Sequence, residues 1–184
     1  MDRHHENPDN PGEIRRNLQC LRSIIRHMEK LKMVFLNALK VKAGDLYDTL
    51  ETDKYKCIDT IRNHPSRDVR WAALQILLKN IGRHPEVAGT CKKVLAEEKD
   101  PMIRSVALRG LSDYCKFSRD MTVFHIFSDI MYDDSTEYRL KRTSYFCILD
   151  VLNIEISNRP SFRDFNFPDD VDWTLVALAM RRGG

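Results

Sequence analysis

The first side chains in the sequence that could bind a metal ion are His4-His5-Glu6. A zinc or iron site needs three or four such ligands, and no H-x-x-x-H pair or paired cysteine elsewhere completes the set. The other histidines stand alone, and two of them precede a proline and so mark turns: His27, His64, His84 and His125. We therefore expect no metal site and no other cofactor.

The candidate nucleophiles are five widely spaced cysteines, none of them in a C-x-x-C pair: Cys20, Cys57, Cys91, Cys115 and Cys147. Their odd number argues against a disulfide framework or a zinc ribbon and favours reduced thiols in a cytoplasmic protein. Cys57 and Cys91 occupy equivalent positions of an internal repeat, which predicts buried packing residues. The glycine-rich motifs G-x-x-x-x-G-K-[ST] and G-x-G-x-x-G are absent. The sequence therefore predicts a protein that is not an enzyme.

The composition predicts a folded, mostly helical chain. Of its 184 residues, 42% are hydrophobic and 31% charged, and the 7 glycines and 7 prolines are too few for a fold rich in turns. No run of about 18 apolar residues exists, so we expect no membrane-spanning segment and no membrane partner. The first residues lack the apolar core of a signal peptide.

The net charge of +3 is unevenly distributed. Residues 13–42 hold eight basic and two acidic residues, a net charge of +6, whereas residues 163–172 are acidic. Such polarity could steer an anionic partner toward one end of the molecule. The alternative is that the basic residues only solvate the outer face of a long helix.

Residues 1–12 hold two prolines and no large apolar residue after Met1, so we expect a disordered leader. From Glu13 the apolar residues recur at alternating spacings of four and three, which is typical of an amphipathic helix. They begin with Ile14, Leu18, Leu21, Ile25 and Met28. Gly44 is the expected end of this helix. A helix of about 28 residues is long for a globular domain, and a break near Lys32 is an alternative.

Three stretches of the sequence align with one another, beginning at Ser66, Asp100 and Ser135. Each carries an apolar or aromatic residue three positions later and then an arginine: Arg70, Arg104 and Arg139. The arginines lie 34 and 35 residues apart. An apolar residue stands nine positions before each of them: Ile61, Leu95 and Ile130. Repetition at this period predicts stacked helical hairpins.

One hairpin cannot bury its own apolar face, so we expect neighbours to stack and share a core. The first helices are expected at Tyr47–Asn63, Glu86–Glu98 and Met121–Tyr132, and the second helices at Arg67–Ile81, Pro101–Phe117 and Thr136–Leu152. The residues that open the three stretches are predicted to cap the second helices. The repeated arginines are predicted to form a structural ladder to carboxylates or carbonyls of the adjacent repeat; the alternative is a shared anion-binding ridge.

The second helices resemble those of the HEAT-repeat family, in which an acidic or proline turn precedes V-R-x-x-A-x-x-x-L. The matching residues are Val69-Arg70 with Ala73 and Leu77, and Ile103-Arg104 with Ala107 and Leu111. The third copy departs from the pattern, because Arg142 stands where the first two copies have a small residue, alanine. The resemblance covers residues 45–152 and implies an all-α fold, an α-solenoid of about four stacked hairpins whose second helices line a concave binding face. The motif carries no catalytic residue.

The C-terminal part has a different pattern. Asn158-Arg159-Pro160 interrupts any helix, and three phenylalanines follow among polar residues: Phe162, Phe165 and Phe167. This pattern fits either a strand or an extended arm packed on the end of the solenoid, before a last helix at Val171–Met180. We expect one domain over residues 13–184, with the repeats at about 45–152 and a C-terminal cap at 158–180. A role in partner binding is the alternative for this cap.

Side chains of the second helices that point away from the predicted core form the candidate partner-binding surface: Trp71, Gln75, Lys79, Arg109, Ser112 and Lys141. A tryptophan flanked by polar and basic side chains is typical of an interface hot spot, although Trp71 packed between repeats is the alternative.

The predicted function is therefore a non-catalytic protein–protein binding module, either an adaptor or an immunity protein that blocks a toxin or an enzyme. The alternative is a HEAT-like protein that binds the nucleic-acid backbone. The sequence pI of 8.6 lies below that of a dedicated nucleic-acid binder, which weighs against this alternative. The oligomeric state is left open by the sequence.

Overall fold

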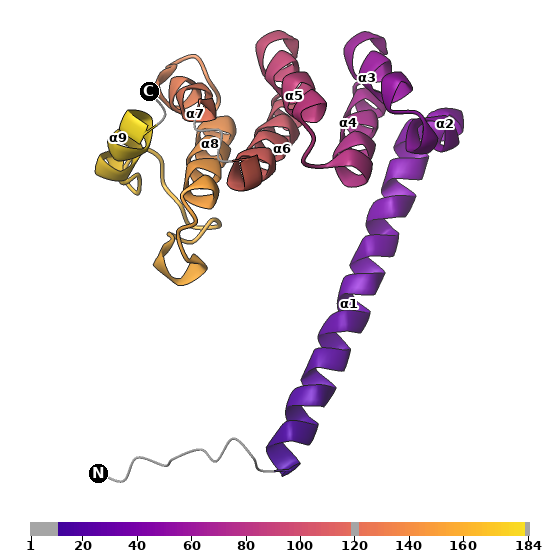
Figure 1. The fold of residues 1–184 in the computed structure, drawn as a ribbon, viewed down its shortest axis with the longest axis vertical. Helices are drawn as coiled ribbons and strands as arrows, with labels where there is room; N and C mark the ends of the chain where they lie inside the picture. Colours follow the sequence, from indigo (N-terminus) through magenta and orange to yellow (C-terminus); the bar gives the residue numbers. More distant parts are fainter. Residues whose placement is uncertain (1–10, 119–121, 183–184) are drawn as a thin grey trace. The chain divides into compact units, whose positions relative to one another are not determined.

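The computed structural model describes residues 11–118 and 122–182, and in these two ranges the regular elements are helices, without a β-strand (Figure 1). The protein is therefore all-α, as its composition predicts. The helices are α1 (Pro11–Ala43), α2 (Tyr47–Thr52), α3 (Lys54–Asn63), α4 (Arg67–Ile81), α5 (Pro85–Glu97), α6 (Pro101–Ser118), α7 (Val123–Tyr132), α8 (Tyr138–Val151) and α9 (Trp173–Arg182). Two 3₁₀ turns lie at Gly44–Leu46 and Ile156–Asn158.

The chain divides into two units, and the boundary lies between Val41 and Lys42. The first unit consists of nearly all of α1, and the second carries the remaining helices. The prediction of one domain from residue 13 onward stays a prediction.

Helix α1 runs without a break through Lys32, so the alternative of two shorter helices is wrong. Leucine, methionine, lysine and arginine dominate it, and these residues lose little side-chain freedom in a helix. Pro11 takes the first turn, where its missing N–H costs nothing, and so residues 11 and 12 belong to the helix and not to the predicted leader. Residues 1–10 of that leader lie outside the described residues. Gly44 has a φ of +55° and ends the helix as predicted.

The helices of the second unit pack in sequential pairs. Helix α3 packs on α4, α5 on α6, and α7 on α8, and the second helices α4, α6 and α8 also pack on one another in turn. Figure 1 shows α3, α5 and α7 along one row and α4, α6 and α8 along another. The repeated apolar positions Ile61, Leu95 and Ile130 are buried, as are Ala73 and Ala107 at the small position.

Gly110 of α6 lies close against Leu78 of α4. A Cβ atom on Gly110 would lie 2.6 Å from Cδ2 of Leu78 and 3.0 Å from Sγ of Cys91, both closer than real side chains come. The absence of a side chain at Gly110 therefore permits the second helices to pack against each other and against α5.

The predicted boundaries are confirmed for α4, whereas the first predicted helix is divided. Asp53 has an extended backbone between α2 and α3, and its carboxylate accepts hydrogen bonds from the amides of Tyr55 and Lys56. This capping bond starts a new helix where the apolar pattern alone predicted one helix over Tyr47–Asn63.

Only one of the three predicted caps is confirmed within the described ranges. Asp100 Oδ1 accepts hydrogen bonds from the amides of Met102 at 2.9 Å and Ile103 at 3.1 Å. Ser66 makes no side-chain capping bond. Ser135 instead donates its hydroxyl to Asp133, which moves the start of α8 from the predicted Thr136 to Tyr138.

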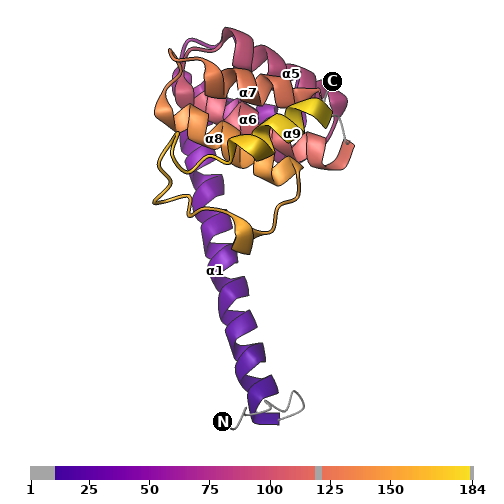
Figure 2. The same ribbon diagram turned by 90° about the vertical axis from the view of Figure 1, so that its left-hand side faces the viewer.

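The C-terminal arm packs on α8, and the strand expected as one alternative does not form among its described residues. Phe165 is buried and stacks on Tyr145, with ring centroids 5.3 Å apart. The Tyr145 hydroxyl accepts a hydrogen bond from the amide of Asp172, just before α9. Trp173 of α9 packs on Tyr132 of α7. Figure 2 views the molecule from this end, with α7, α8 and α9 toward the viewer.

Candidate functional site

The predicted partner-binding residues of α4 are held by neighbouring side chains. Trp71 is half-buried, and the ammonium group of Lys42 lies 5.3 Å from the centre of its ring. Lys79 donates a hydrogen bond of 2.8 Å to Glu51. Gln75 is half-buried. This part of the predicted surface therefore consists of ion pairs and a covered ring, with little free apolar area.

Two of the predicted residues lie in the interior, so their placement on an exposed surface is wrong. Ser112 is buried, and its hydroxyl donates to the carbonyl of Cys147 across the α6–α8 contact. The side chain of Lys141 is only 11% exposed, and its ammonium group lies 5.4 Å from the centre of the Phe167 ring. The direct packing of α6 and of the C-terminal arm on α8 buries both residues.

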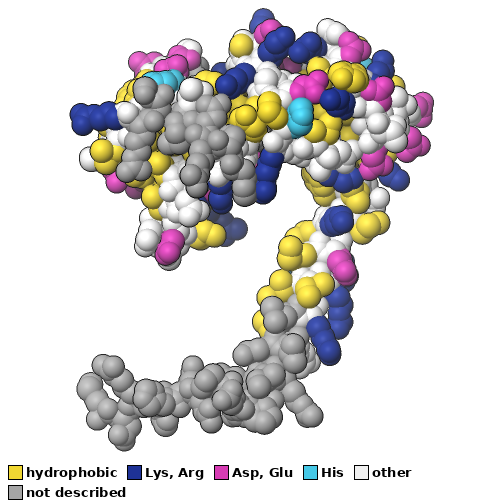
Figure 3. Space-filling view, viewed as in Figure 1, with side chains coloured by type: hydrophobic (Ala, Val, Ile, Leu, Met, Phe, Trp, Pro, Cys, Tyr) yellow, Lys and Arg dark blue, Asp and Glu magenta, His cyan; other side chains and the backbone are white. Residues whose placement is uncertain are grey.

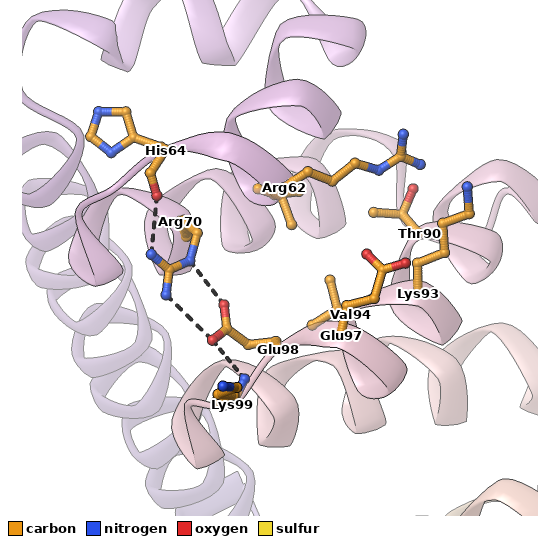
Figure 4. A pocket seen from close by; sticks show the side chains of 10 residues that line it. Arg62, His64, Arg70, Thr90, Lys93, Val94, Glu97, Glu98 and Lys99 are labelled. Atoms are coloured by element: carbon orange, nitrogen blue, oxygen red, sulfur yellow. Dashed lines mark hydrogen bonds and ion pairs between the residues drawn. The ribbon is translucent and has the colours of Figure 1, made fainter.

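Of the three repeated arginines, Arg70 contacts a carboxylate of the next helix pair. Its guanidinium donates to both carboxylate oxygens of Glu98, at 2.9 and 3.3 Å, and to the carbonyls of His64 and Pro65 at 3.0 Å (Figure 4). Burial raises the pKa of Glu98, but hydrogen bonds from Arg70 and from the backbone amides of Asp100 and Lys99 outweigh it and leave this pKa below its ordinary value. Arg70 therefore links α4 to the end of α5.

The other two arginines do not repeat this contact. Nε of Arg104 is buried and has no hydrogen-bond partner, and Arg139 is exposed. Asp133 occupies the position of the next repeat that corresponds to Glu98. Its carboxylate instead accepts hydrogen bonds from Ser135 and Thr136. Among the described residues the predicted contact therefore forms at Arg70 alone, because Asp133 of the third turn is hydrogen-bonded within its own turn.

A hollow of about 350 Å³ lies beside Arg70, between the ends of α3 and α5. Figure 4 shows basic and acidic side chains around it: Arg62, Lys93, Glu97, Glu98 and Lys99. The mixture of charges, with no nucleophile placed next to a base, gives this hollow no evident chemistry. Across residues 11–118 and 122–182, no group of three or more His, Cys, Asp or Glu side chains could hold a metal ion.

Sequence reasoning missed a cluster of two exposed aromatic rings around an arginine, which we call the aromatic–arginine cluster: Tyr138, Arg142 and Phe162. The guanidinium carbon of Arg142 lies 4.3 Å from the centre of the Phe162 ring and 5.7 Å from that of Tyr138. Arg142 also donates to the carbonyl of Phe162 at 3.3 Å. Phe162 is 46% exposed and Tyr138 is 44% exposed.

A second hollow, of about 280 Å³, adjoins this cluster and includes Arg109, one of the predicted binding residues. Its lining consists of Arg109, Thr143, Phe146, Cys147, Asp150 and Phe162. Arg109 is exposed at this hollow, as the sequence predicted. Polar, aromatic and charged groups therefore meet between α6, α8 and the C-terminal arm.

The surroundings hold the aromatic–arginine cluster in place. Phe146 packs edge-on against Phe162, with centroids 4.9 Å apart, and against the buried Phe165 at 5.3 Å. Asp150 forms an ion pair with Arg159 at the base of the arm. The sequence held a signal for this site, because Arg142 replaces the small residue of the repeat and three phenylalanines follow in the arm. Nothing in the sequence showed that the arm folds back onto α8.

No family model, curated protein or solved structure matches this chain. None of the helices in the described part of the chain is both long and apolar enough to span a bilayer.

Proposed function

We propose that this chain is a non-catalytic protein-binding module, an adaptor or an immunity-type inhibitor, built on a HEAT-like α-solenoid. The pairing of α3 with α4, α5 with α6 and α7 with α8, and the stacking of the second helices, support the solenoid. So does the close approach at Gly110. The proposed binding surface is the aromatic–arginine cluster with Arg109, at the last repeat.

The observation that carries this proposal is the exposure of two aromatic rings whose centres lie within 6 Å of one guanidinium. Tyrosine and arginine are enriched among interface hot spots, which lie beside pockets that a partner side chain fills. Stacking on Phe162 and Tyr138 already holds the Arg142 side chain, so binding would cost it little further rotamer entropy. The rings present apolar surface to a partner, and the guanidinium presents donors.

The charges of the second unit favour a protein partner over a nucleic acid. Six of its basic groups form close ion pairs with a carboxylate: Lys42–Asp68, Lys54–Glu86, Arg67–Asp100, Arg70–Glu98, Lys79–Glu51 and Arg159–Asp150. A nucleic-acid-binding face needs a stripe of unmatched basic groups that can displace counterions. Exposed aromatic rings beside an arginine are instead typical of protein recognition.

The experiment is quantitative affinity capture from the source cell, with three full-length baits: wild type, Phe162→Ala and Tyr55→Ala. Tyr55 is the matched control, because it is also an exposed ring beneath a cation, Lys54, on the distant helix α3. We expect a protein that wild type and Tyr55→Ala retain equally and that Phe162→Ala retains at least tenfold less. Equal retention by all three baits would move the binding surface elsewhere.

A salt titration with generic duplex DNA tests the alternative function. Submicromolar binding that weakens steeply with salt would overturn the protein-binding proposal in favour of backbone recognition.

Charge reversal at Arg109 should weaken the protein complex while leaving the melting temperature unchanged, because the side chain is exposed.

A further inference from the structure

Helix α1 carries the largest group of exposed apolar side chains in the described part of the chain. Between 37% and 66% of the surface of each of seven residues is exposed: Ile24, Ile25, Met28, Leu31, Met33, Val34 and Phe35. Figure 3 shows hydrophobic side chains along one edge of α1 and basic side chains along the other. Met33 lies on the opposite side of the helix from the other six. A single exposed leucine is ordinary, but an apolar face formed by six large side chains marks an interaction site.

The spacing of these residues is that of a coiled-coil seam. Ile24, Met28, Leu31 and Phe35 follow one another at intervals of four, three and four. Leu21 and Ala38 continue the same alternation in the sequence, at three residues on either side. A 4–3 repeat keeps one stripe facing a partner helix when the two helices wind around each other.

The basic residues lie away from this stripe. Arg22, Arg26 and Lys30 fall on the outer positions of the heptad, where two paired helices expose their side chains to water. Like charges therefore do not face each other across the seam. Lys32 is the one basic residue next to it within the exposed apolar stretch, and a lysine stem can pack there while its ammonium group stays in water.

We propose that α1 pairs with α1 of a second copy of this chain, through a coiled coil centred on Ile24, Met28 and Leu31. Residues 2–10 contain no apolar side chain other than Pro8 and so offer no apolar stripe in their sequence. A second α1 supplies an apolar stripe of the same period and length.

The extent of the face matches what a stable interface needs. Full burial of a large apolar side chain removes roughly 60–120 Å² from water, so the six of them other than Met33 remove about 360–720 Å² from each chain. A standard protein interface buries about 800 Å² per partner, and the aliphatic stems of neighbouring residues add to the sum. A helix of 33 residues is about 50 Å long, enough for more than four heptads.

The test measures the mass of the full-length protein by sedimentation equilibrium from about 1 to 100 μM, with Leu31→Glu and Met33→Glu alongside. The two residues are equally exposed, at 55% and 56%, and lie on opposite sides of the same helix. We expect wild type and Met33→Glu to show a multiple of the 21.6 kDa monomer mass. Leu31→Glu should raise the dissociation constant at least tenfold and shift the protein to a monomer.

Circular dichroism of each variant keeps the test independent of folding, and Leu31→Asn provides a milder polar change that should act in the same direction. A wild-type protein that stays monomeric at 100 μM would overturn the proposal, as would equal effects of the Leu31 and Met33 variants. A monomer that binds vesicles of anionic phospholipid would assign the face to a lipid surface instead.

Discussion

Arg70 and Glu98 join the beginning of α4 to the end of α5 through two hydrogen bonds, from Nε at 2.9 Å and from Nη2 at 3.3 Å. The side chains are 19% and 13% exposed, so the pair is largely withdrawn from water. The same guanidinium satisfies the carbonyls of His64 and Pro65 in the turn before α4. One arginine therefore fixes both the turn within its own hairpin and the position of the next one.

Replacement of Arg70 by leucine should lower the free energy of unfolding by about 2–3 kcal/mol, because it leaves a mostly buried carboxylate and two carbonyls without their donor. Urea unfolding at pH 7 measures the loss. Arg139→Leu is the matched control, since Arg139 stands at the equivalent position of the third repeat and is exposed; its effect should stay within about 0.5 kcal/mol. Equal losses in the two variants would show that the Arg70 contact is not what stabilises the junction.

The same pair predicts a dependence of stability on acid. The pKa of Glu98 is lower in the folded protein than its ordinary value of 4.5, so the unfolded chain binds a proton first as the pH falls. The stability that the pair contributes is therefore present above about pH 4.5 and is lost as the pH drops through the folded pKa. Between pH 6 and pH 3, wild type should lose more unfolding free energy than Glu98→Gln, as measured by urea titrations. Parallel curves for the two proteins would contradict this.

The two phenylalanines at the ends of Phe162-Arg163-Asp164-Phe165 should have opposite roles. Phe165 is 3% exposed and stacked on Tyr145, so Phe165→Ala should cost about 3–5 kcal/mol of unfolding free energy. Phe162 is 46% exposed, and Phe162→Ala should cost less than about 1 kcal/mol while it removes partner binding. Thermal melts and the capture experiment together separate the two roles. A large loss of stability in Phe162→Ala would make the cluster a packing feature.

The sequence predicts features that depend on local pattern, but it does not predict features that depend on tertiary contacts. The period of the repeat and the apolar positions predict the helix pairs and the burial of Cys57 and Cys91, because helix formation and burial follow from local pattern. The motif also places an arginine near the start of each second helix. It does not predict which carboxylate that arginine contacts. Arg70 pairs with Glu98, whereas Asp133 of the third turn accepts hydrogen bonds within its own turn.

The candidate site was predictable only in part, since it depends on a long-range contact. Arg109 was identified because its helix face could be read from the period. Ser112 and Lys141 were misplaced, because the arm and the α6–α8 contact cover the faces on which they lie. The exposed ring of Phe162 belongs to an arm 20 residues after Arg142, and no periodic signal relates the two.

The cysteines should differ sharply in reactivity. Cys20 is exposed, whereas Cys57, Cys91 and Cys147 are buried. Burial raises the pKa of Cys57 to about 11 and that of Cys91 to about 12, which leaves almost no thiolate at neutral pH. Titration of the native protein with a thiol reagent at pH 8 should therefore modify one cysteine rapidly, and denaturation should release all five. The Cys20→Ser variant should lack the fast phase, and a fast phase that persists there would place a reactive thiol in the repeats.

Alanine at two glycines tests the close approach of the second helices. Gly89 lies in α5 and a Cβ there would meet no atom within 4 Å, so Gly89→Ala should raise the unfolding free energy by about 0.5–1 kcal/mol through helix propensity. At Gly110 the same gain is opposed by the contacts at 2.6 Å with Leu78 and 3.0 Å with Cys91, and overpacking of this kind costs about 1–3 kcal/mol. Gly110→Ala should therefore be less stable than Gly89→Ala by about that amount in urea unfolding. The double variant Gly110→Ala with Leu78→Ala should recover part of the clash energy, although it loses apolar packing of its own. If Gly110→Ala were as stable as Gly89→Ala, α4 and α6 would lie farther apart than the structure places them.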